Sequence, residues 1–239
     1  MSQLVEHHSR KAARILDSAR ELVLDHGAGK VTVSEISRAA GVGKGTVYLY
    51  WPSKEDLIRG LFARDLLTLM DQSISRITAD PATVQPRHLA ALLLRTTRQL
   101  PLANRTYRGD TELLRLFAEE PADRELFARI NPAAMCSAVM PILHRHGLIR
   151  DDQPLPRQTY VVHAVLGGFF AAVSEPAIAP PGVDDPVEVL ADTMATLLEP
   201  AAPPGRAAIA AAAEETVAVF RDVRAAVLDL IHRGQTPVP

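Results

Sequence analysis

The sequence predicts an all-α fold, with a three-helix amino-terminal head followed by a larger helical domain. Apolar residues recur at spacings of three and four through most of the chain, and no segment alternates convincingly as a strand would. Glycine and proline pairs separate the helical segments. A chain of 239 residues with 47% hydrophobic content can bury one large core, or a small head packed on a larger domain.

The first predicted helix runs from Ser9 to His26. Its apolar positions Ile15, Ala19 and Val23 recur at helical spacing, and Gly27 stops it. This segment is therefore the first helix of the head.

A short helix, a glycine turn and a second short helix follow. Thr32 stands three residues before Glu35, which is the spacing of a capping box, and Gly41 ends the helix that it opens. The next helix begins within 42–45 and runs to about Tyr50. This order of elements is the helix-turn-helix that places a recognition helix in the DNA major groove.

A longer helix continues beyond the head. Pro52 disfavours helical geometry at the residue before it, and Ser53 can cap a helix that extends through Ile74. Further helices are predicted at about Arg87 to Leu100, Thr106 to Glu119, Pro121 to Arg145, Arg157 to Ser174, Pro186 to Leu198 and Arg206 to Arg233. The last helix has apolar residues at heptad-like spacing, so one face of it is expected to pack against another surface, either the chain's own core or a second subunit.

These elements divide the chain into three parts. Residues 1–53 form the helix-turn-helix domain, and residues 54–199 form a helical regulatory and dimerisation domain. Residues 200–239 are a linker and the last helix.

The third helix of the head carries the residues expected to contact DNA. Val47 falls on the inward face, whereas the pairs Lys44/Tyr48 and Thr46/Tyr50 lie four residues apart on exposed faces. Ammonium, hydroxyl and ring groups can reach phosphates, base edges and thymine methyls. An isolated pair of tyrosines would be read as half-buried packing, but the register of three helices and a glycine turn favours DNA binding.

The segment from Val31 to Leu57, including the run Gly41-Val42-Gly43-Lys44-Gly45-Thr46-Val47-Tyr48-Leu49-Tyr50-Trp51-Pro52-Ser53-Lys54, resembles the amino-terminal domain of the tetracycline-repressor (TetR) family. The resemblance covers about residues 10–60. One departure is Trp51, where the family more often has phenylalanine. The resemblance implies DNA contacts at the following residues: Thr32, Val33, Lys44, Gly45, Thr46, Tyr48, Tyr50 and, as a phosphate clamp, Lys54.

The same resemblance implies a homodimer on a near-palindromic operator and a carboxyl-terminal domain with a pocket for an apolar small molecule. Dimerisation is expected through the predicted helices Arg157 to Ser174 and Pro186 to Leu198. Ordinary core packing is a close rival interpretation for these two helices, and it is favoured over ligand binding for every candidate pocket residue. These candidates are Leu113, Phe117, Met135, Met140, His163, Phe169 and Phe170.

Several other classes of protein are disfavoured. Lys44 is followed by Gly45 and preceded by a helix, which does not fit a phosphate-binding loop after a strand. The chain has no Gly-x-Ser-x-Gly or His-Glu-x-x-His motif, so no enzyme activity, cofactor or metal site is expected. No apolar run is long enough for a membrane span, and the start of the chain lacks the features of a signal peptide. With a single cysteine, Cys136, these features predict a cytoplasmic protein.

The lysines of the chain are concentrated in the predicted head. The net charge is −2, but all four lysines lie within the first 60 residues. Two functions remain open: a repressor that leaves its operator when a small molecule binds, and a dimeric DNA-binding regulator that is controlled by a protein partner or is constitutive.

Overall fold

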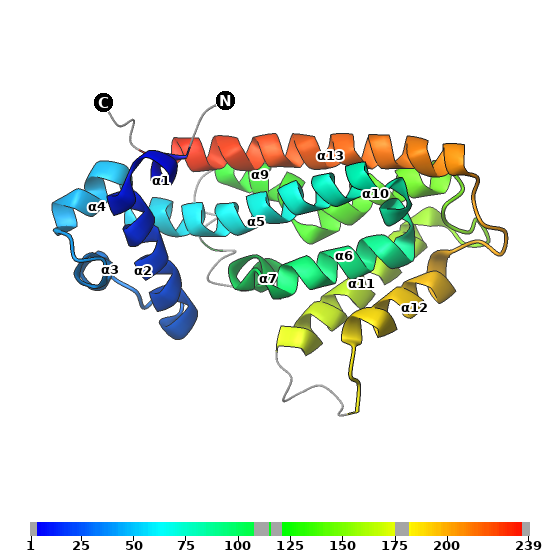
Figure 1. The fold of residues 1–239 in the computed structure, drawn as a ribbon, viewed down its shortest axis with the longest axis horizontal. Coiled ribbons are helices and arrows are strands. Elements are labelled where there is room, and N and C mark those ends of the chain that lie inside the picture. Colours follow the sequence, from blue (N-terminus) through cyan, green and yellow to red (C-terminus); the bar gives the residue numbers. More distant parts are fainter. Residues whose placement is uncertain (1–3, 108–114, 116–120, 175–181, 236–239) are drawn as a thin grey trace.

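A computed structural model describes residues 4–107, 115, 121–174 and 182–235, and all regular structure in these residues is helical. A small head lies at one end of the elongated molecule (Figure 1). It consists of α1 (Val5–His8), α2 (Arg10–His26), α3 (Val33–Ala39) and α4 (Lys44–Tyr50).

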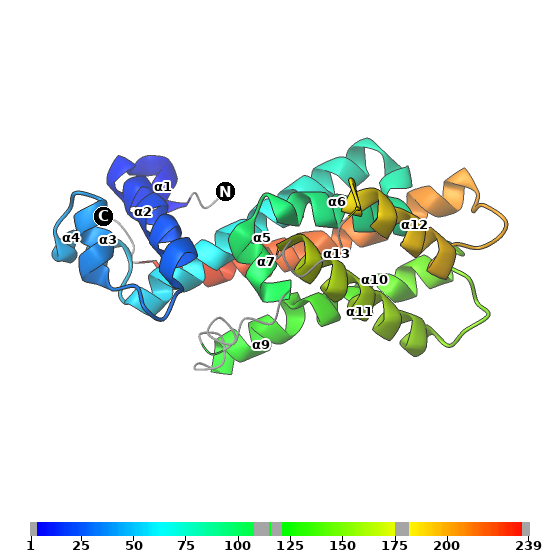
Figure 2. The same cartoon turned by 90° about the horizontal axis from the view of Figure 1, so that it is seen from below.

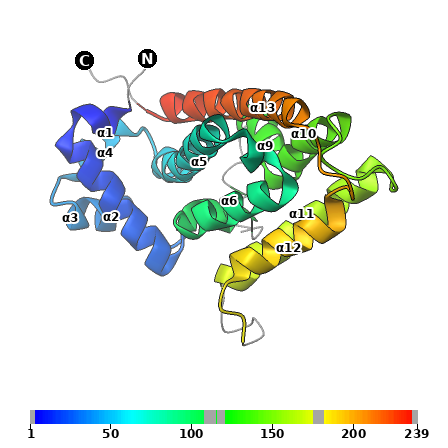
Figure 3. The ribbon, with the colours of Figure 1, turned by 45° about the vertical axis from the view of Figure 1, so that its right-hand side comes forward.

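The larger domain is a bundle built around two long helices. Its elements are α5 (Lys54–Ala79), η1 (Pro81–Val84), α6 (Pro86–Arg98), α7 (Pro101–Tyr107), α9 (Pro121–Ile130), α10 (Pro132–Arg145), α11 (Leu155–Ser174), α12 (Pro186–Leu198) and α13 (Arg206–Arg233). Helix α5 leaves the head, and α13 runs back along it until Gly234 reaches Asp56 (Figures 1 and 2). The last helix therefore packs on its own chain. Helices α11 and α12 lie side by side on the face opposite α13 (Figure 3).

Some helix boundaries differ from the sequence prediction. The segment predicted as one helix from Pro121 to Arg145 breaks at Asn131, whose Oδ1 accepts a hydrogen bond from Ala134 N at 2.9 Å. Pro132 follows as the first residue of α10, a position where its missing N–H is harmless. Most of the helix predicted from Thr106 to Glu119 lies outside the described residues.

A short helix that the sequence prediction missed, α1, ties the start of the chain to α5. The side chains of Leu4 and Val5 are buried, and Arg64 Nη2 donates to Glu6 Oε2 at 2.7 Å. Burial alone would raise the pKa of Glu6, but the hydrogen bonds and charge of Arg64 outweigh it and hold the pKa below its ordinary value of 4.5.

This pair should make stability depend on pH in the acid range. Because the folded pKa of Glu6 is depressed, its contribution is complete above pH 4.5 and is lost as the pH falls through the folded pKa. Glu6→Gln is expected to lower the free energy of unfolding by about 1 kcal/mol at pH 7 and by progressively less below pH 4.5. Thermal melts of the wild-type protein and of Glu6→Gln across pH 3 to 7 measure the difference in stability between them. A difference that stays constant over this range would contradict the assignment.

The carboxylate of Asp65 joins the head to the larger domain. Its side chain is 1% exposed and pairs with Arg20 of α2 through Oδ1. Its Oδ2 accepts from Leu102 N at 3.0 Å and Ala103 N at 3.2 Å, at the start of α7. One buried group thus connects α2, α5 and α7.

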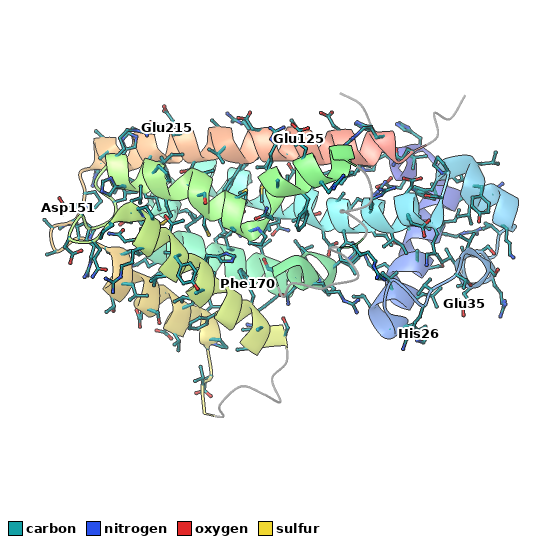
Figure 4. All side chains as sticks on the ribbon, turned by 180° about the vertical axis from the view of Figure 1, so that it is seen from behind. His26, Glu35, Glu125, Asp151, Phe170 and Glu215 are labelled. Carbon is teal, nitrogen blue, oxygen red and sulfur yellow. The ribbon has the colours of Figure 1, made fainter. Side chains whose placement is uncertain are left out.

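The far end of the bundle is closed by a second charged cluster. Glu215 of α13, labelled in Figure 4, pairs with Arg145 and accepts from His146 Nε2 at 2.7 Å. The hydrogen bond of His146, followed by that of Arg145, lowers the pKa of Glu215.

Among the described helices, none is both long and apolar enough to cross a membrane.

Candidate DNA-binding site and ligand cavity

The predicted helix-turn-helix forms from local signals. Thr32 Oγ1 accepts from Glu35 N at 3.3 Å, and Glu35 Oε2 accepts from Thr32 N at 2.9 Å, which completes the capping box. The same carboxylate accepts from Thr32 Oγ1 at 2.7 Å. Because both groups satisfy free helix-end donors, α3 has a defined start.

The turn between α3 and α4 depends on glycine. Gly41 has φ +62°, a conformation that residues with a side chain rarely adopt. Val42 N then donates to Ser37 O at 2.9 Å, which returns the chain toward α3. The turn therefore sets the angle at which α4 leaves.

Helix α4 is anchored on one face and open on the other. Val47 and Trp51 are at most 1% exposed and pack into the core of the head. On the outer face, Lys44 is exposed and the side chain of Tyr48 is 47% exposed. Gly45 is exposed and Thr46 half-buried, and an added Cβ at Gly45 would meet no heavy atom within 4 Å. This surface, Lys44, Gly45, Thr46 and Tyr48, is called the outer α4 face below.

Two of the residues expected to contact DNA also make contacts within the head, and their DNA contacts stay predictions. The Tyr50 hydroxyl forms a hydrogen bond of 2.7 Å with Ser9 Oγ, and its ring lies 5.7 Å from that of Trp51. Tyr50 is therefore part of the junction between α4 and α2. Val33 is 8% exposed, so only its backbone remains for a DNA contact.

Sequence reasoning also missed Leu49, which is 67% exposed on α4. The alternation of inward and outward residues assigned polar and aromatic side chains to the surface and gave no role to a leucine between two tyrosines. Its exposure makes it a further candidate for apolar contact with a thymine methyl.

Lys54 has partners that no sequence pattern indicated. Its Nζ donates to the carbonyl oxygens of Ala28, Gly29 and Val31 at 3.4, 3.4 and 3.1 Å. A lysine ammonium has three donors, and these carbonyls take all three. Lys54 thus holds the segment between α2 and α3 against the start of α5, and a phosphate contact by this residue stays a prediction.

Lys54→Met is expected to reduce the free energy of unfolding by about 1 kcal/mol, because three hydrogen bonds to the α2–α3 segment are lost. Operator affinity should fall as α3 loosens, while the salt dependence of binding stays unchanged. Binding titrations at several salt concentrations measure this slope. A slope reduced by about one ion would instead assign Lys54 to a phosphate.

A largely apolar cavity lies inside the larger domain. Its cavity volume is about 70 Å³, below the roughly 300 to 1,000 Å³ of typical small-molecule sites, and part of the cavity opens to solvent. Its walls come from α5, α6, α10, α11, α12 and α13. The lining residues are Met70, Pro86, Leu89, Ala90, Leu93, Pro132, Met135, Cys136, Val139, Met140, Leu143, Val162, Leu166, Met194, Leu198 and Phe220.

The candidate pocket residues fall into four groups. Met135 and Met140 line the cavity. Phe170, labelled in Figure 4, is fully buried and Phe169 is half-buried in the core, but neither belongs to the lining. His163 lies in a separate open groove between α10 and α11. The remaining two, Leu113 and Phe117, lie outside the described residues.

The helix-turn-helix segment is similar to known DNA-binding regulators. Residues 15–61 match the family model described as bacterial regulatory proteins, tetR family. The fatty acid metabolism regulator protein of Bacillus subtilis (strain 168) is 39% identical over 70 residues, which are 29% of this chain and 34% of that protein. The HTH-type transcriptional repressor LfrR of Mycolicibacterium smegmatis is 38% identical over 84 residues, 34% of this chain and 42% of that protein. The matched segments thus span less than half of either relative.

Most of the fold is similar to that of a solved structure. The fatty acid degradation regulator FadR from Bacillus halodurans superimposes with a TM-score of 0.54 at 19% identity, covering 80% of this chain and 95% of that one. This similarity extends from the head through the larger helical domain.

Fold and site together define an all-α protein with an amino-terminal helix-turn-helix. The amino-terminal segment, residues 15–61, is the part of the chain that carries the similarity to the tetR family of bacterial regulatory proteins.

Proposed function

We propose that this protein is a repressor that binds a palindromic operator as a homodimer and leaves it when an apolar small molecule enters the cavity of the larger domain. The observation that carries the proposal is the combination, in one chain, of an exposed outer α4 face and an internal apolar cavity, with α5 belonging to both regions. We assign residues 1–53 to DNA binding and residues 54–199, with α13 packed on α5, to regulation and dimerisation.

The outer α4 face suits double-stranded DNA. Lys44 offers an ammonium to phosphate or guanine, Thr46 a hydroxyl and Tyr48 a ring with a hydroxyl. Gly45 allows the DNA backbone to approach α4 closely, because no side chain stands there. Lys44 and Tyr48 lie four residues apart and therefore share one face of α4, with the exposed Gly45 beside them.

The surface of α11 and α12 supports a dimer. Tyr160, Val189 and Leu197 are 74%, 43% and 37% exposed there. An added Cβ at Gly167 or Gly168 would meet nothing within 4 Å, so the packing of a single chain does not explain why these positions are glycine. Close approach of a second copy explains both features, and a symmetric dimer places two heads on two half-sites.

Helix α5 supports a coupling between ligand and DNA. Met70 lines the cavity, and Lys54 at the other end of α5 holds the segment before α3. A ligand that binds one spacing of the two heads more tightly shifts the population toward it. The shift is limited to the difference in affinity, typically about 1 to 3 kcal/mol. Release rather than activation is favoured by the name of the LfrR relative, which is a repressor.

The second candidate function is a dimeric DNA-binding regulator without a small-molecule ligand. Its supporting observation is that part of the cavity wall is ordinary core, with Met194 and Phe220 at most 1% exposed. Thermal melts of the full chain with and without uncharged apolar compounds separate the two. The repressor requires at least one compound that raises the melting temperature and also dissociates the operator complex in fluorescence anisotropy, and a compound set that does neither would favour the second function.

A further inference from the structure

The sulfur atoms of this chain are concentrated in one place. The sequence contains five methionines and one cysteine. Apart from Met1, every one of them lines the cavity of the larger domain: Met70, Met135, Cys136, Met140 and Met194. The other buried apolar residues are leucine, isoleucine, valine, alanine, phenylalanine and the single tryptophan, Trp51.

These sulfur side chains approach the cavity from three helices. Met70 belongs to α5, Met140 to α10 and Met194 to α12, and each is at most 3% exposed. Met135 and Cys136 add half-buried positions on α10. Methionine is unbranched and rotates freely, and its thioether is polarisable, so a wall of methionines can adapt to ligands of different outline.

The lining offers no anchor for a charge. Besides the sulfur residues it contains only proline, leucine, alanine, valine and phenylalanine. Burial raises the pKa of Cys136 to about 11, so the thiol stays neutral at physiological pH. A carboxylate or phosphate inside the cavity would lose its hydration without a compensating hydrogen bond.

Two charged residues that adjoin the lining in sequence, Arg87 and Asp71, form ion pairs with other residues of the chain. Arg87, next to Pro86, donates from Nε to Glu199 Oε2 at 2.9 Å, and Glu199 follows Leu198. Asp71, next to Met70, pairs with Arg224. Neither pair leaves an unopposed charge for an anionic ligand.

We infer that the cavity takes uncharged, polarisable ligands, with aromatic hydrocarbons and their apolar derivatives as the preferred class, and accepts several shapes within that class. This inference rests on the proposed ligand-responsive function and adds the chemistry of its ligand. Sulfur makes favourable contacts with aromatic rings, which an aliphatic wall does not provide. Ligand binding then needs no buried hydrogen bond.

Competition for a fluorescent probe on the full-length protein tests the charge requirement. N-phenyl-1-naphthylamine is the uncharged aromatic probe, and naphthalene, methyl laurate, laurate and lauroyl-CoA are each tested as competitors for its site. We expect naphthalene and methyl laurate to compete, and laurate to compete at least about 10-fold more weakly than its methyl ester. Failure of the probe to bind, or stronger competition by laurate or lauroyl-CoA than by the ester, overturns the inference.

Methionine variants test the role of sulfur. The double variant Met140→Leu, Met194→Leu keeps an apolar wall of similar volume. Its affinity for naphthalene is expected to fall about threefold or more relative to its affinity for methyl laurate, because only the aromatic ligand loses sulfur contacts. Ser137→Ala, an exposed position of α10 outside the lining, is the matched control and should change neither affinity. Equal losses for both ligands in the double variant would contradict the sulfur contribution.

Both experiments measure ligand binding in the absence of DNA. Their outcome can therefore be distinguished from a failure of the proposed repressor function. Ligands that bind as expected but leave the operator complex intact would uphold the ligand class and refute release. Operator release by a charged ligand, with no binding of the uncharged set, would uphold the repressor and refute the ligand class.

Discussion

Lys44→Ala and Tyr48→Ala are each expected to weaken operator binding by about 10-fold to 100-fold, without lowering the melting temperature of the free protein. Both side chains are exposed on α4, so their removal costs no core packing. Each loses contacts to base edges or phosphates worth about 1 to 3 kcal/mol. Fluorescence anisotropy with a labelled operator duplex measures the affinity.

Arg206→Ala is the matched charge control for this pair of variants. Arg206 is exposed at the start of α13, at the end of the bundle far from the head (Figure 1). Its removal should leave specific affinity almost unchanged. Wild-type affinity in both Lys44→Ala and Tyr48→Ala would show that the outer α4 face is not the surface that reads DNA.

Asp65→Ala is expected to lower the free energy of unfolding by about 3 kcal/mol, the largest effect on stability among the variants considered. The change leaves two backbone N–H groups of α7 without their acceptor and removes the partner of Arg20. Asp65→Asn keeps a hydrogen-bond acceptor and should lower the free energy of unfolding by less than Asp65→Ala does. Urea denaturation followed by circular dichroism measures both changes.

The same helix offers a matched control. Asp71 pairs with Arg224 at the surface, where the two side chains are 48% and 39% exposed. Such exposed pairs contribute little, so Asp71→Ala should cost less than about 1 kcal/mol. If Asp65→Ala cost no more than Asp71→Ala, the buried carboxylate would not be the junction that joins α2, α5 and α7.

The helix-turn-helix could be predicted because its signals are local. The capping box of Thr32 and Glu35 spans three residues, and Gly41 acts through its own backbone angle. The predicted ends of α12 and α13 agree for the same reason, since proline, glycine and a capping aspartate act on adjacent residues.

Roles that depend on distant partners could not be predicted. Tyr50 bonds to Ser9, 41 residues away, and Lys54 to carbonyls 23 to 26 residues away. No periodic pattern within one helix reveals such contacts. Val33 was assigned a DNA contact by resemblance, although its side chain completes the core of the head.

The lining of the cavity also depends on contacts between residues that are distant in sequence. Met135 and Met140 are candidates because they are apolar residues of a helix expected to face inward, but Met70 and Met194 reach the cavity from helices far apart in sequence. Their common location becomes visible only once α5, α10 and α12 have packed. Phe170 shows the converse, because an aromatic residue on an inward face can be core rather than lining.

The central claim is that this protein reads DNA through the outer α4 face. Footprinting of the full-length protein on the DNA upstream of its own gene tests it most directly. We predict protection of a near-palindromic site with two half-sites about one helical turn apart, and loss of that protection in the Lys44→Ala, Tyr48→Ala double variant. No protected site, or an unchanged footprint with the double variant, would contradict the claim.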